Sequence, residues 1–189
     1  MSVMTRAALS LLVIAVSATA TAEPRPRSHG FYAEAGIGAK GFLGDAAESS
    51  KVGPVASLHI GYDLFSWFSV GGRLESSTHE ATVPPPPEGE FYQLYSGGGE
   101  GRLGFSAGPM AFFVDGSVGV TLISTNILTK VMILDPGEEL TIFFSAGGGV
   151  EYQLQNRHYA LGLAGNWYSL PAFDQVTGVS GRAYLRYTY

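Results

Sequence analysis

The chain contains 189 residues, carries a formal net charge of −5, and has 26 glycines but no cysteine. Without cysteine, disulfide scaffolds and thiolate metal or redox centres are excluded, and without a basic excess so is a nucleic-acid-binding surface. Only 14% of the residues are charged, against roughly 25% in a typical soluble domain, which is low for a protein that faces water on all sides.

Residues 1–22 have the pattern of a cleavable secretory signal. A basic start at Arg6 precedes an apolar run that is shorter than the roughly 20 residues of a membrane-spanning helix. Small residues at alternate positions follow this run, and we expect cleavage after Ala22. The proline-broken segment 23–29 is then a short leader, and residues 30–189 are expected to form one domain.

Eight segments of this domain alternate between apolar and polar side chains, as strands with two different faces do. No later apolar run is long enough for a membrane helix, so a membrane form of the chain must be a closed barrel, the other fold that satisfies every backbone polar group in lipid. The eight predicted strands cover approximately 30–40, 54–62, 67–78, 91–105, 110–122, 140–154, 158–169 and 179–189.

Ten ionisable residues of these strands share the face opposite the aliphatic one. They are Glu34, His59, Arg73, Glu75, Glu100, Arg102, Asp115, Glu151, Arg182 and Arg186. A register shift of one residue would place them all in lipid, at about 2–4 kcal/mol for each arginine near the midplane. We therefore predict an all-β, eight-stranded antiparallel up-and-down transmembrane β-barrel, with a packed polar network of ion pairs in its lumen. A soluble lipocalin-type barrel, with charges facing water, is the alternative fold.

Aromatic residues support the same orientation. Nine of them lie near the predicted short-turn ends of the strands, where an interfacial girdle is expected. This larger group comprises Phe31, Tyr62, Trp67, Phe68, Phe105, Phe112, Tyr152, Tyr159 and Tyr187. A smaller group, Phe91, Tyr95 and Trp167, lies toward the other end of the strands.

The last predicted strand presents Leu185, Tyr187 and Tyr189 on its apolar face. This aromatic end resembles the signal by which outer-membrane β-barrels are recognised by the barrel assembly machinery. It departs from the usual signal because Tyr184 occupies the place of the expected glycine and Gly181 lies earlier. The resemblance implies that these three outward residues guide assembly, at an efficiency that the tyrosine puts in doubt.

Long predicted loops follow strands one, three, five and seven, and short turns follow strands two, four and six, as in bacterial outer-membrane barrels. In these features residues 30–189 resemble the small eight-stranded barrels of Gram-negative bacteria, of the OmpA-barrel and OmpX type. The resemblance implies a location in the outer membrane, next to lipopolysaccharide. Such families include anchors, adhesins, receptors and a few lipid-modifying enzymes, so the fold alone assigns no task.

Two motifs suggest chemistry, and both have plainer explanations. The run from Gly36 to Gly41 matches a dinucleotide fingerprint but lacks the following helix, so we expect no cofactor and interpret inward glycines as room for large side chains from other strands. Ser57 and His59 share the inward face, and barrel lipid A deacylases use a similar pair, which keeps a lipid A-modifying enzyme as an alternative. The other histidines have no metal-ligand spacing.

One predicted loop contains an apolar patch outside the membrane, formed by Val131, Met132, Ile133 and Leu134. Exposed patches of this kind often mark partner sites. A strand extension and a packed loop are the alternative interpretations of this segment. The leading hypothesis is a non-enzymatic barrel that serves as anchor or component of a cell-envelope protein complex. The glycine- and alanine-rich composition and the proline run 84–87 are similar to barrels accessory to gliding motility, so surface motility or adhesion is the expected setting. A lipid A-modifying enzyme and a small-solute pore are the alternatives.

Overall fold

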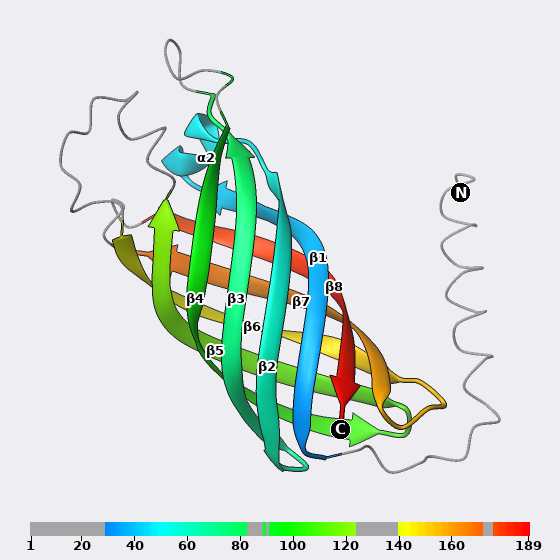
Figure 1. The fold of residues 1–189 in the computed structure, drawn as a ribbon. Helices are drawn as coiled ribbons and strands as arrows, with labels where there is room; N and C mark the ends of the chain where they lie inside the picture. Colours follow the sequence, from blue (N-terminus) through cyan, green and yellow to red (C-terminus); the bar gives the residue numbers. More distant parts are fainter. Residues whose placement is uncertain (1–28, 83–88, 90, 124–139, 172–175) are drawn as a thin grey trace, which may run out of the picture.

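The structure is a computed structural model that describes residues 29–82, 89, 91–123, 140–171 and 176–189. These residues form a closed barrel whose eight antiparallel strands follow one another in sequence order, with β8 pairing back onto β1 (Figure 1). The strands are β1 Phe31–Leu43, β2 Gly53–Phe65, β3 Phe68–Glu80, β4 Phe91–Ala107, β5 Met110–Ile123, β6 Leu140–Gln153, β7 Tyr159–Leu170 and β8 Val176–Thr188. The predicted eight-stranded up-and-down barrel is confirmed.

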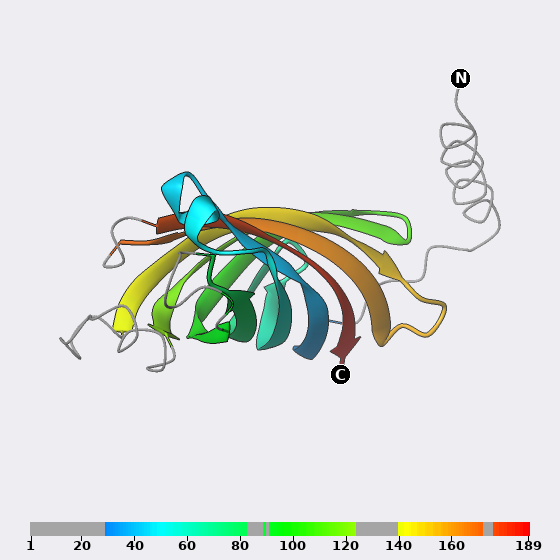
Figure 2. The same cartoon turned by 90° about the horizontal axis from the view of Figure 1, so that it is seen from above.

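The segment between β1 and β2 was predicted to be a plain polar loop, and that prediction is wrong in part. A short helix, α2 (Asp45–Ser49), follows Gly44, whose φ of 64° lies in the left-handed region that glycine adopts without strain. Ser50 then forms an isolated β-bridge with Ala81, so the loop is tied to the end of β3. Figure 2, seen from above, shows α2 over the strand ends on the long-loop side.

The two faces of the wall differ as the alternation predicts. Aliphatic side chains point outward and are well exposed, for example Ile37 at 74%, Val114 at 60% and Leu163 at 59%. Polar and charged side chains point into the barrel and are buried. In the part of the chain that is described, no helix is long and apolar enough to cross a membrane.

Inward glycines give the wall its close packing. A Cβ added at Gly162 would run into the ring of Tyr184, and one added at Gly149 would run into the ring of Phe113. Tyr32 covers a third such site, at Gly61. The rings of one strand therefore occupy the space that glycines of a neighbouring strand leave empty, which lets the sheet curve without leaving voids.

The lumen is not uniformly polar. Near the long-loop end, the buried Tyr92 and Leu94 pack with Ala81, while Phe143, Tyr168 and Leu170 form a second buried cluster, and Phe42 and other partly buried side chains pack against them. The sequence pattern predicted a polar network on the inner face, but at this end apolar and aromatic side chains fill much of it. A third buried cluster, formed by Phe113, Ala164 and Tyr184, lies elsewhere in the lumen, so hydrophobic packing is shared among several clusters.

Candidate functional site

All ten ionisable residues singled out in the sequence lie inside the barrel and are buried. The densest contacts surround Glu34 of β1, in the half of the lumen nearer the short turns. Arg102 donates two hydrogen bonds to the Glu34 carboxylate, at 2.6 and 3.0 Å, and Arg186 reaches the same group at 3.5 Å. Glu151 lies 3.7 Å from Arg102 and 3.8 Å from Arg186. Four strands therefore meet in one ion-pair cluster.

A second cluster surrounds Glu75 on β3. Lys40 approaches one oxygen of this carboxylate at 2.6 Å, and Arg73 donates to the other oxygen at 2.5 Å. Arg73 also donates to the hydroxyls of Ser117 and Ser145, both at 3.1 Å. These contacts join the walls on opposite sides of the lumen.

Glu100 connects the two clusters. Its carboxylate lies 3.3 Å from Arg102, 3.9 Å from Arg73 and 3.1 Å from Nδ1 of His59. A continuous set of charged side chains therefore runs through the lumen. Burying so many charges is costly unless each is paired, and the short distances provide that pairing.

The lumen cations also lie over aromatic rings. The guanidinium of Arg186 is 3.9 Å from the ring centroid of Tyr32, and that of Arg102 is 4.2 Å from the centroid of Phe113. Lys40 lies 4.3 Å from the centroid of Tyr168. Such desolvated cation–π contacts contribute about 2 kcal/mol or more each. The inward rings thus hold the cations in place as well as filling space.

Sequence reasoning left out two members of the network, Lys40 and Asp63. Arg186 donates two hydrogen bonds to the Asp63 carboxylate, at 2.7 and 2.6 Å. Both residues continue the inward parity of their strands, Lys40 after Glu34 and Asp63 after His59, so the alternation contained the signal. Asp63 was missed because β2 extends beyond its predicted end, through the residues assigned to a turn.

Asp115 and Arg182 are bridged by a neutral side chain. Asn166 lies between them, donating to Asp115 at 2.7 Å and accepting from Arg182 at 3.5 Å. Among the described residues, Oδ1 of Asp115 and Nε of Arg182 have no hydrogen-bond partner. A cavity of about 10 Å³ beside Asn166 is wide enough for a single water molecule. A second cavity, of about 40 Å³, opens at the short-turn end near Asp63.

The candidate catalytic pair lies within this interior. Ser57 is 9% exposed and His59 is 1% exposed, and the Ser57 hydroxyl has no hydrogen-bond partner among the described residues. His59 instead faces Glu100. The pair therefore has neither the mutual contact nor the access to lipid that acyl transfer requires.

In the described part of the chain, no three His, Cys, Asp or Glu side chains are placed to hold a metal ion together.

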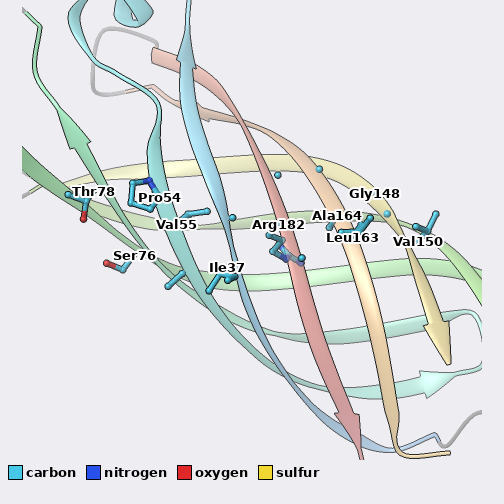
Figure 3. Close-up of a pocket in the computed structure, with 16 residues that line it drawn as sticks. Ile37, Pro54, Val55, Ser76, Thr78, Gly148, Val150, Leu163, Ala164 and Arg182 are labelled. Atoms are coloured by element: carbon cyan, nitrogen blue, oxygen red, sulfur yellow. The ribbon is translucent and has the colours of Figure 1, made fainter. Parts of the chain in front are cut away.

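A shallow groove of about 1140 Å³ lies on the outside of the barrel (Figure 3). It crosses β1, β2 and β3 and continues over β6, β7 and β8. Small residues such as Ala56 and Ala183 line it between the exposed side chains of Ile37 and Leu163. Because this face carries the aliphatic residues, the groove is a feature of the lipid-facing wall rather than a route into the lumen.

The residues of the expected assembly signal lie on the outer face of β8. Tyr187 packs against Tyr159 at 4.8 Å and Tyr189 at 4.7 Å between ring centroids, within the girdle at the short-turn end. Leu185 is 44% exposed beside them. Tyr184 points inward, and its hydroxyl donates to Glu151 at 3.1 Å. The tyrosine that replaces the usual glycine is thus part of the lumen network.

Several predictions fall on segments outside the described residues. They are the secretory signal over residues 1–22, the leader 23–29 except for its last residue, the proline run 84–87, and the apolar patch of Val131, Met132, Ile133 and Leu134. All of them stay predictions.

The family description "Outer membrane protein beta-barrel domain" matches residues 7–178. Neisserial surface protein A has a similar structure, with a TM-score of 0.61 and 14% identity over 87% of this chain and 100% of that chain. OprG from Pseudomonas aeruginosa has a similar structure with a TM-score of 0.58 and 11% identity, over 87% of this chain and 98% of that chain. Ail of Yersinia pestis has a TM-score of 0.53 and 11% identity, over 85% of this chain and 98% of that chain. No curated protein sequence matches the chain. The chain therefore belongs to the outer-membrane β-barrel family and resides in the outer membrane.

Proposed function

We propose that this protein is a non-enzymatic anchor of the outer membrane, which acts through its surfaces as a component of a cell-envelope complex. The observation that carries the proposal is the filled lumen, in which charged side chains form continuous contacts from Lys40 to Asp63. Because the interior is filled by its own side chains, we expect the protein to bind its partners through the outer wall, the loops and the rims of the barrel.

A small-solute pore is disfavoured by the same packing. An eight-stranded barrel is just wide enough for its own side chains to fill it. Here ion pairs dominate the half nearer the short turns, and the half nearer the long loops is filled by the clusters around Leu94 and Phe143 together with the Lys40–Glu75 ion pair. A solute would have to break both sets of contacts to pass.

A lipid A-modifying enzyme is disfavoured by the position of its candidate residues. Ser57 and His59 face inward from β2, whereas lipid contacts the outward face of the same strand. An ester bond of a lipid would have to cross the strand wall to reach the hydroxyl. Surface motility or adhesion is the setting we propose, with Val131, Met132, Ile133 and Leu134 as the partner patch and the barrel assembly machinery as the partner during insertion.

The test combines three measurements on the tagged full-length protein. We expect no step conductance in planar bilayers, unchanged lipid A in cells that overproduce the protein, and a discrete envelope protein that co-purifies after cross-linking in intact cells. Replacing residues 131–134 with serine should abolish that co-purification, while replacing the prolines 84–87 with serine serves as the control. Conductance, altered lipid A or an unchanged cross-link in the 131–134 variant would contradict the proposal.

A further inference from the structure

The outer face of β3 and β4 changes character toward the long-loop end. Near the short turns and at mid-strand it carries apolar side chains such as Leu74 and Leu103. Toward the other end most outward residues are uncharged hydrogen-bonding groups or aromatic rings, and the charged Glu80 among them is paired with Lys51. We call the uncharged set the outer patch, and its members are Ser76, Thr78, Phe91, Gln93 and Tyr95.

The strand register brings the outer patch together. Ser76 pairs with Tyr95, Thr78 pairs with Gln93, and Glu80 pairs with Phe91 across the two strands. The Tyr95 hydroxyl donates to the Gln93 side-chain carbonyl at 3.0 Å, which holds the ring and the amide side by side. Phe91 is 64% exposed and Tyr95 is 48% exposed. The patch is therefore a single open surface.

The height of the patch along the barrel follows from the strand length. Ten residues separate Tyr95 from Phe105 of the opposite aromatic girdle. At about 2.5 Å of height per residue in a tilted strand, Tyr95 lies about 25 Å above that girdle, which equals the apolar band of such barrels. Gln93 and Phe91 lie about 5 and 10 Å higher still. Leu94 pairs with Ile123, the last residue of β5, so residues 91–93 of β4 extend past the described end of β5. The patch thus faces sideways at the level of the outer-leaflet headgroups.

The inner side of these strand ends is rigid. Tyr92 and Ser50 share a hydrogen bond of 2.5 Å between their hydroxyls, and His79 contacts the backbone carbonyl of Lys51 at 3.1 Å. The His79 ring also packs on Phe42, at 4.8 Å between ring centroids. A surface supported in this way loses little conformational entropy when a ligand binds.

The charges beside the patch distinguish between the parts of a glycolipid. Among the described residues, Lys51 is the cation nearest to the outer patch along the strands. Its ammonium group lies 2.7 Å from the Glu80 carboxylate, which neutralises it. A phosphate group would therefore meet no unpaired positive charge here. Hydroxyl, amide and phenol groups match the donors and acceptors of sugar hydroxyls, and an aromatic face offers an apolar surface to the C–H side of a sugar ring.

From this geometry we propose that the outer patch binds a neutral sugar of the lipopolysaccharide core in the surrounding outer leaflet. Phe91 supplies the stacking surface, and Gln93, Tyr95, Ser76 and Thr78 supply hydrogen bonds. The site lies on the outside of the wall and is independent of the sealed lumen and of any partner at the loops.

The first test places a photo-cross-linking amino acid at position 91 or 93 in living cells. We expect cross-links to lipopolysaccharide in a strain with a complete core and their loss in a strain whose core sugars are truncated. The same amino acid at Leu103, in the apolar band, should cross-link in both strains because it contacts acyl chains. Equal cross-linking at positions 91 and 93 in the two strains, or capture of a protein in place of lipopolysaccharide, would overturn the proposal.

The second test titrates the full barrel in phospholipid nanodiscs with detached, dephosphorylated core oligosaccharide. Phe91→Ala and Gln93→Ala should each weaken binding about tenfold, the loss of one hydrogen bond or stacking contact. Phe105→Ala, the aromatic exchange at the other end of the same outward face, should leave binding unchanged. A retained gel-mobility shift on heating shows that each variant is folded. Equal affinity in all variants, or competition by inorganic phosphate, would contradict the assignment.

Discussion

The two halves of the lumen are filled by different mixtures of side chains: ion pairs dominate near the short turns, and apolar clusters surround the Lys40–Glu75 pair near the long loops. In the half nearer the short turns, Glu34, Arg102 and Arg186 form ion pairs, whereas in the half nearer the long loops, Leu94 and Phe143 belong to apolar clusters. Alternation along a strand decides only which side chains point inward. The comparison shows that the same inward face can close a narrow barrel either by paired charges or by hydrophobic packing, and each half should respond differently to substitution.

The largest effect is expected in the charged half. Arg102→Ala leaves Glu34 and Glu100 buried without their main cation, and breaking a buried pair in this way costs about 3–5 kcal/mol. The free energy of unfolding in urea should fall by that amount, and the temperature of the gel-mobility shift should fall with it. Arg157→Ala, in the exposed turn after β6, is the matched control. An unchanged shift temperature would show that the network does not stabilise the fold.

In the apolar half, Leu94→Ala tests packing without charge. Leu94 is 2% exposed, and removing its side chain should cost about 2–4 kcal/mol through lost burial and the cavity left behind. The loss should be insensitive to salt because no charge is involved. Leu103→Ala on the outward face of the same strand is the control and should cost less. A loss that depends on salt would contradict the contrast between the two halves.

A glycine pair sharpens the difference between the inner and outer faces. Gly162→Ala would push a Cβ into the ring of Tyr184, and such overpacking costs about 1–3 kcal/mol. At Gly181, on the outward face, a Cβ meets nothing within 4 Å. Gly181→Ala should therefore be neutral or slightly stabilising in urea unfolding. If both variants lose the same stability, the inward rings are not packed as described.

The smallest effect is expected outside the lumen. Lys51 pairs with Glu80 at 2.7 Å, but the Lys51 side chain is 57% exposed. Lys51→Ala should cost about 0.2–1 kcal/mol because water and salt screen an exposed pair. Urea unfolding at low and at high salt is the measurement. The difference in unfolding free energy between Lys51→Ala and the unsubstituted protein should vanish at high salt. A loss as large as that of Arg102→Ala would remove the distinction between buried and exposed pairs.

Sequence alternation predicted the number and the order of the strands, because the side-chain period of a strand is a local property. The structure buries the ten ionisable residues that the alternation assigned to the inner face. The alternation did not predict which charges meet. Glu34 and Arg102 are 68 positions apart, and their contact depends on the curvature and closure of the whole sheet. The alternation did place Tyr184 inward, but it did not predict that this ring would cover Gly162 or that Phe143 would join a buried apolar cluster. The helix α2 escaped notice because five residues give no readable period.

The pairing of β1 with β8 has a consequence for how the barrel forms. Twelve residue pairs join the first strand to the last, and Arg186 reaches back to Glu34 over 152 positions of the chain. The entropy of bringing such distant segments together must be overcome before any of these contacts can form. Pairing of β1 with β8 is therefore expected to be the final and slowest step of insertion, and the contact between Arg186 and Glu34 should stabilise the closed barrel once the two strands have paired.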